Sequence, residues 1–197
     1  MERCPFFEKC LKNSYKEGQE NQVYLAEESP AVFDRFVAFI YHNRVDKKMT
    51  SPDNSLLVRT FVLADKFCMP GFQNALVDAI ACFYKTREVS APDLAFVNDH
   101  VPSNSKIRAF LLDKMVFDII KDEEDNTLVE NVNEILRRGG DLATEIFWAV
   151  READPKEHGP SSWRNRCDYH NHQMDDKQEC YRKREIAEKD SEKGHKK

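Results

Sequence analysis

The sequence has little of what enzyme sites and membrane anchors require. Its 197 residues include only six glycines, with no glycine-rich phosphate loop and no G-x-S-x-G nucleophile motif. No apolar run approaches the ~20 residues of a membrane-spanning helix. The N-terminus, Met1 to Phe7, lacks the basic and apolar regions of a signal peptide. We therefore expect neither catalysis nor a membrane association, and we place the chain inside the cell, in the cytoplasm or the nucleus.

An excess of positive charge and a dense spacing of cysteines are also missing. A net charge of −5 provides no overall field for nucleic acid, so we expect no nucleic-acid partner. The six cysteines show no dense spacing of the kind that predicts a disulfide framework. An apolar fraction of 41% is nevertheless enough for a core, although 33% charged residues keep much of the chain in water. The composition predicts an intracellular globular protein.

Apolar residues recur at helical spacing along most of the chain, which predicts a mainly α fold. Ser29-Pro30 is typical of a helix start, and Gly139-Gly140 of a helix end. Near the N-terminus, Lys16 to Asn21 has the composition of a polar turn, and Val23 to Leu25 that of a residual short strand or hairpin. The sequence predicts helices near residues 3–11, 32–41, 57–68, 72–85, 92–100, 106–120, 128–138 and 142–150.

The helical pattern divides the chain into three expected regions. Residues 1–87 form the first helical cluster, and residues 88–153 form a helical extension that packs on it. The pattern ends beyond that point, and residues 154–197 have few apolar side chains to bury. We expect this polar region, which contains cysteine and histidine, to be a largely disordered C-terminal tail.

Several motifs occur in a fixed order in the first region, and together they resemble the BTB/POZ domain family. The resemblance covers about Arg3 to Thr86 and implies a protein-interaction module. Some members of this family are substrate adaptors for cullin-based ubiquitin ligases. The motifs are Phe6-Phe7, Tyr15 to Glu20, Val23 to Leu25, the F-x-x-F-x-x-F-I-Y run from Phe33 to Tyr41, and Leu63 to Pro70.

The first part of the family pattern has no counterpart in this sequence. That part holds strands, a first helix and an H-K-x-x-L segment, and it carries much of the usual homodimer surface. We therefore expect no standard homodimer. Apolar side chains such as Phe6, Phe33 and Phe61 would then need another cover. Three alternatives are open: the helices after residue 90 cover these side chains, a partner covers them, or they stay uncovered.

The resemblance also points to one partner-binding motif. Tyr15-Lys16-Glu17 matches the aromatic-x-Glu motif that many BTB adaptors present to a cullin scaffold. An exposed aromatic side chain beside a charge combines packing with a directional polar contact. The alternative is that Tyr15 only closes a helix while Glu17 faces solvent.

One cluster in the C-terminal region has the composition of a metal site. Cys167, His170, His172 and Cys180 supply two thiolates and two imidazoles, a set that can hold a structural zinc ion in tetrahedral geometry. A zinc ion would hold together a segment with too little apolar surface to fold alone. The alternative is a polar tail in which these residues fall close by chance. Besides a BTB-type interaction protein, two functions thus stay open: a small zinc-stapled regulatory protein, and a non-functional truncated gene product.

Overall fold

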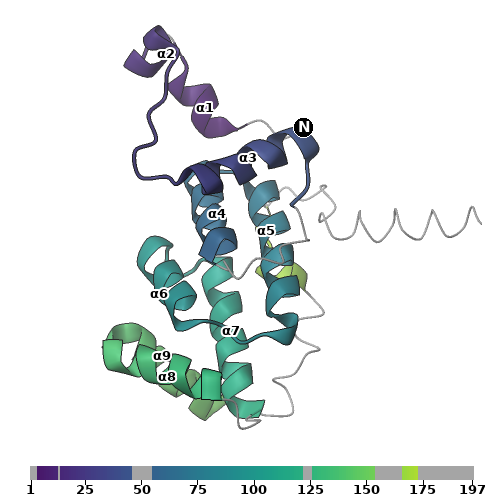
Figure 1. Cartoon of the computed structure of the whole chain (residues 1–197), viewed down its shortest axis with the longest axis vertical. Helices are drawn as coiled ribbons and strands as arrows, with labels where there is room; N and C mark the ends of the chain where they lie inside the picture. The colour runs from purple at the N-terminus through teal and green to yellow at the C-terminus, as the bar shows by residue number, and fades with distance from the viewer. Residues whose placement is uncertain (1–3, 13, 46–54, 122–125, 154–165, 173–197) are drawn as a thin grey trace, which may run out of the picture.

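The computed structural model of this chain describes residues 4–12, 14–45, 55–121, 126–153 and 166–172. These residues form a layered array of helices, in which α3 lies across the ends of α4 and α5 and the later helices extend away from it (Figure 1). The α-helices are α1 (Pro5–Cys10), α2 (Lys16–Glu20), α3 (Pro30–His42), α4 (Ser55–Lys66), α5 (Pro70–Phe83), α6 (Ala91–His100), α7 (Lys106–Lys121), α8 (Asn126–Arg138) and α9 (Gly140–Glu152). Two 3-10 turns, η1 (Tyr84–Thr86) and η3 (Arg166–Tyr169), complete the described elements.

The mainly α prediction is confirmed, but the predicted strand is wrong. Val23 to Leu25 has no strand geometry, and no strand occurs anywhere in the described ranges. A strand needs a neighbour to accept its backbone hydrogen bonds, and the described residues offer none. The segment therefore runs as an irregular connection between α2 and α3, despite its β-type composition.

Local sequence signals explain where the central helices begin and end. Ser29 caps α3 by accepting a hydrogen bond from the backbone nitrogen of Val32 (3.3 Å), and Pro30 occupies the first helical position. After α4, Cys68 adopts a left-handed backbone conformation (φ 56°). Pro70 then starts α5, so the two helices form a tight corner.

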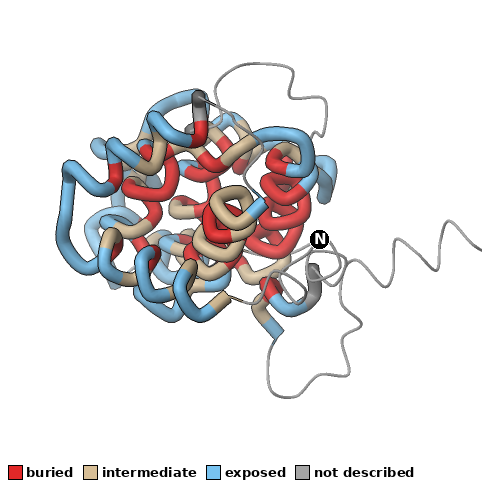
Figure 2. The backbone as a smooth tube through the Cα atoms, turned by 90° about the horizontal axis from the view of Figure 1, so that it is seen from below, coloured by how far each residue is buried: buried red, intermediate tan, exposed pale blue. Residues whose placement is uncertain are grey.

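Helix α5 is the centre of the core. Ten consecutive residues, from 72 to 81, are buried in it. In Figure 2 the buried residues concentrate in the interior segments, whereas the outer turns are exposed. A helix covered on all sides is typical of the interior of a helical array.

The helices after residue 90 cover part of the first region. Helix α6 packs against α4, α7 packs against α6 and α9, and α8 packs against α6 and α9. Phe61 of α4 is buried in the common core, while Phe6 and Phe33 are half-buried and pack at its edge. The helical extension thus covers α4, whereas the Phe6 ring packs on Phe67 and the Phe33 ring on Phe36, both within the first region.

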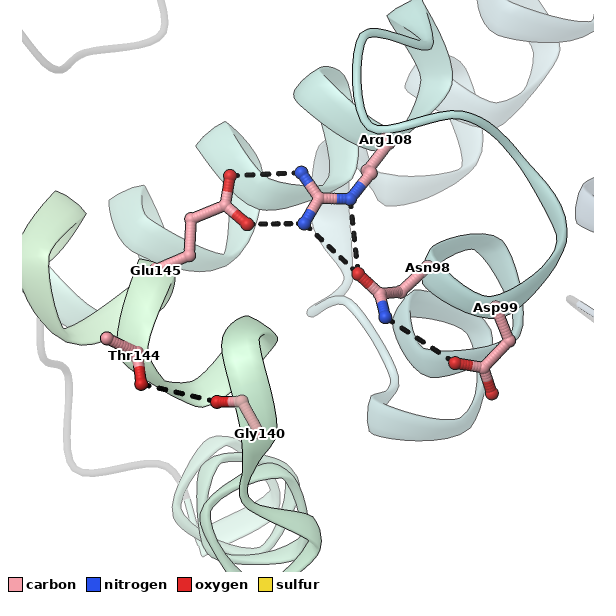
Figure 3. A network of polar contacts seen from close by, with 6 residues as sticks. All are labelled: Asn98, Asp99, Arg108, Gly140, Thr144 and Glu145. Carbon is pink, nitrogen blue, oxygen red and sulfur yellow. Dashed lines mark hydrogen bonds and ion pairs between the residues drawn. The ribbon is translucent and has the colours of Figure 1, made fainter.

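A polar network joins the extension together (Figure 3). The Arg108 guanidinium donates to both carboxylate oxygens of Glu145 on α9, with a distance of 3.0 Å from Nη1 to Oε1. It also donates to Oδ1 of Asn98 on α6, at 3.2 and 3.0 Å. The hydrogen bonds from Arg108 hold the pKa of the Glu145 carboxyl below its usual value. One buried arginine therefore fixes α6, α7 and α9 relative to one another.

Candidate protein-interaction site

The N-terminal helix α1 is held to the core by an aromatic cluster. The Phe6 ring stacks on Phe67 with centroids 4.7 Å apart, and the Phe7 ring meets Phe67 at 5.2 Å and Phe36 at 5.8 Å. Phe67 follows α4 and Phe36 belongs to α3. These ring contacts position a helix of only six residues, which is too short to be stable alone.

Helix α2 projects beyond α1 at one end of the molecule (Figure 1). Sequence composition indicates only a polar turn here, but residues 16–20 form a short helix. The backbone nitrogen of Tyr15 donates to the carbonyl oxygen of Lys12 (3.0 Å), which closes the turn between the two helices. Asn21 ends α2 in a left-handed conformation (φ 50°).

Gly18 is the point at which α2 contacts the end of α1. It is the buried residue of α2, and a Cβ atom built on it would lie 2.0 Å from the carbonyl oxygen of Lys12. No side chain fits in that space, because the nearest atoms belong to the backbone. The close approach fixes the direction in which the residues around Gly18 face.

We predict that Gly18→Ala separates α2 from α1. The added methyl group forces the backbone apart, and overpacking of this kind costs about 1–3 kcal/mol. Hydrogen exchange of the amides in residues 15–22 should accelerate, while exchange in α5 stays unchanged. The substitution Gly139→Ala is a useful comparison, since a Cβ atom there meets no atom within 4 Å and the cost comes only from its φ of 66°. Unchanged exchange around α2 in the Gly18 variant would contradict this account of the turn.

The α1–α2 turn presents an exposed edge. We define the α1–α2 edge as Leu11, Tyr15 and Glu17, all exposed, with 56% of the Tyr15 surface accessible. The two residues that the sequence predicts as partner-binding, Tyr15 and Glu17, therefore both face solvent. An aromatic ring, an aliphatic side chain and a carboxylate on a fixed turn provide the elements of a binding hot spot.

A second exposed apolar group lies at the other end of the array, on α8 and α9 (Figure 1). The Phe147 and Trp148 rings meet edge to face at 5.5 Å, and the Arg151 guanidinium lies 5.0 Å from the Trp148 ring. Nearly half of the Trp148 surface is exposed, so this ring is not part of the core. The sequence signal for an exposed apolar surface at this end lies in α8. Its exposed residues Val129 and Leu136 are seven positions apart, which places them on one face of the helix. The α8–α9 end consists of Val129, Leu136, Phe147 and Trp148.

The proposed zinc ligands lie in and after η3. His170 is 2% exposed, and its Nε2 lies 3.6 Å from Oδ1 of Asp78 on α5. The His172 side chain is exposed, and the two imidazole centroids are 6.0 Å apart. Cys180 and the side chain of Cys167 fall outside the described residues. In the part of the chain that the structure describes, no group of three or more His, Cys, Asp or Glu side chains lies close enough to hold a metal ion. The zinc site thus remains a prediction that depends on the cysteines.

Residues 166–172 have structure that the composition of the C-terminal region does not indicate. They pack against α5 and α7, and the Tyr169 hydroxyl donates to Oδ2 of Asp113 at 2.6 Å. Tyr169 and His170 are both buried. A sequence signal for this packing is hard to find, because two residues in an otherwise polar region carry it.

The helices offer no candidate for a bilayer span. Throughout the described ranges, each one is too short or too polar to cross a membrane.

Comparison with known proteins identifies one family. The family model for the BTB/POZ domain matches residues 1–81, the part of the chain that carries the motifs described above. No curated protein and no solved structure matches the chain. The match ends within α5, so α6 to α9 lie beyond it. The match over residues 1–81 is consistent with the resemblance to the BTB/POZ family, and it supports a protein-interaction module in this part of the chain.

Proposed function

We propose that this protein binds the N-terminal domain of a cullin scaffold through the α1–α2 edge and acts as a substrate adaptor of a ubiquitin ligase. The observation that carries the proposal is the exposed Tyr15 beside Glu17, fixed by the contact between Gly18 and Lys12. A rigid aromatic side chain loses little conformational entropy on binding, which favours it as an anchor. The role requires the chain to be in the cytoplasm or the nucleus.

An adaptor needs a second surface for its substrate, and the molecule offers one. The α8–α9 end lies far from the α1–α2 edge along the array (Figure 1). Its exposed residues Phe147 and Trp148 are of the type enriched at protein interfaces. Two separated surfaces on one helical array support a bridging role rather than a catalytic one.

We predict that Tyr15→Ala together with Glu17→Ala weakens cullin binding. The loss should exceed about 1 kcal/mol, which corresponds to roughly a fivefold rise in Kd. Isothermal titration of the purified chain with a cullin N-terminal domain measures it. The matched control is Tyr41→Ala, which removes another exposed tyrosine, from α3, and should leave Kd unchanged. Equal affinities for the double variant and the wild type would reject this site, and no binding by the wild type would reject the adaptor role.

The alternative is a zinc-stapled regulatory protein that uses its C-terminal Cys/His segment. The positions of His170 and His172, separated by one residue in a packed segment, support it, because their imidazole centroids lie only 6.0 Å apart. With Cys167 and Cys180 as the other ligands, we predict about one zinc ion per chain after purification without chelators. Cys180→Ser should remove it. Less than a tenth of an equivalent in the wild type would reject the zinc site and, with it, this function.

A further inference from the structure

The segment from Asp168 to His172 lies in a site formed by α5 and α7, far from it in sequence. Tyr169 contacts one apolar and one polar side chain of α7. The centroids of its ring and the Phe110 ring lie 5.2 Å apart, edge to face, and its hydroxyl donates to Oδ2 of Asp113 at 2.6 Å. A phenol is therefore recognised by both its ring and its oxygen.

The next residues are recognised through the main chain. Asn74 of α5 accepts from the backbone nitrogen of Asn171 at 2.7 Å and donates to its carbonyl oxygen at 3.0 Å, across 97 positions of sequence. One side-chain amide thus pairs with both backbone groups of one residue. Such pairing holds an extended peptide whatever side chain that residue carries, while neighbouring side-chain contacts provide specificity.

Helix α5 presents a buried polar face to this segment. Gln73 accepts from the side-chain amide of Asn171 at 2.6 Å and in turn donates to Asp65 of α4 at 2.7 Å. One turn further along α5, Asp78 faces the buried imidazole of His170. Buried polar groups require hydrogen-bonding partners, and a helix that only completes a core would carry apolar residues here. The face is suited to a polar ligand, with carboxylates opposite the tyrosine and the imidazole.

We propose that the face formed by Asn74, Asp78, Phe110 and Asp113 is a peptide-binding site, and that residues 168–172 are a resident occupant which a partner peptide replaces. The partner is an extended segment of another protein in which a tyrosine is followed directly by a basic side chain. Its tyrosine takes the place of Tyr169 on Asp113, its basic group takes the place of His170 beside Asp78, and Asn74 holds its backbone. The resident segment keeps the site closed until such a peptide displaces it.

The test uses the full chain and a labelled peptide of residues 166–172, with Cys167→Ser in the peptide to prevent oxidation. The released variant is Tyr169→Ala with His170→Asp, which removes the tyrosine and places a carboxylate against Asp78. Fluorescence anisotropy should show peptide binding to this variant. Binding to the wild type should be at least roughly tenfold weaker, because only molecules with the segment undocked can bind. Adding Asn74→Ala to the released variant should abolish binding.

Several results would overturn the proposal. They are equal affinities for the wild type and the released variant, no binding to a folded released variant, and binding that survives Asn74→Ala. A released variant that fails to fold would also overturn it, since the segment would then be part of the core. Hydrogen exchange of the wild type gives an independent check: the Asn171 amide should exchange at least roughly tenfold faster than the amides of Leu76 and Val77 in α5. Equal protection would mean that the segment does not open. Neither experiment involves a cullin, so its outcome is independent of the adaptor role.

Discussion

Replacing Phe67 with alanine should destabilise the protein more than almost any other single substitution. The side chain is fully buried and contacts the rings of Phe6, Phe7 and Phe36 at centroid distances of 4.7, 5.2 and 5.0 Å. Truncation removes the transfer free energy of a large ring and leaves a cavity, which together cost about 3–5 kcal/mol. Urea unfolding followed by circular dichroism measures the loss.

The position of Phe67 adds a second effect. Because α1 is held mainly by Phe6 and Phe7, the variant should release α1 and α2 before the rest unfolds. Phe147→Ala serves as the control, since that ring is 59% exposed and its removal should change stability by less than about 0.5 kcal/mol. A loss below about 1 kcal/mol for Phe67→Ala would contradict the central place of the aromatic cluster.

Lys114→Met should also cause a large loss of stability, because it breaks a buried ion pair. The Lys114 and Asp118 side chains, one turn apart on α7, are only 5% and 10% exposed, and the ammonium donates to the carboxylate. Removing one partner of a buried pair leaves an uncompensated charge and costs about 3–5 kcal/mol. Chemical unfolding at pH 7 measures this loss. The double variant Lys114→Met, Asp118→Asn should recover most of it, because no buried charge of the pair is left.

The loss in the Lys114 variant should depend on pH. Burial raises the pKa of the Asp118 carboxyl even in the wild type, despite the opposing effect of Lys114. Without the ammonium, the folded-state pKa rises further above the unfolded value. A raised carboxyl pKa favours folding below the unfolded pKa, and this contribution is lost as the pH rises through the folded value. Lys114→Met should thus be least destabilised near pH 4 and most at pH 7. A loss that does not vary with pH would contradict burial as the cause.

Much of the helical core could be predicted from sequence because its signals are local. Ser29-Pro30 fixes the start of α3 through a cap, and the break before Pro70 separates α4 from α5 through backbone geometry. Gly139-Gly140 likewise separates α8 from α9, with both residues at positive φ. Signals of this kind act within one turn of a helix, so one sequence is sufficient to read them.

The features missed by sequence reasoning depend on contacts between distant residues. Val23 to Leu25 has β-type composition, but no neighbouring strand is available among the described residues. Helix α2 depends on the approach of Gly18 to Lys12, and a single glycine in a polar stretch does not reveal it. The packing of Tyr169 against Asp113 joins positions 56 residues apart. The candidate residues Tyr15 and Glu17 came from a family motif, whereas their fixed, exposed placement came from the structure.

Hydrogen exchange with and without a cullin N-terminal domain tests the central claim, that the α1–α2 edge is where the protein binds its scaffold. We predict that saturating cullin slows exchange of the amides in residues 11–22, around Tyr15 and Glu17. The amides of α8 and α9 should keep their exchange rates, which leaves that end free for a substrate. Protection confined to α8 and α9, or no protection at saturating cullin, would contradict binding at the α1–α2 edge.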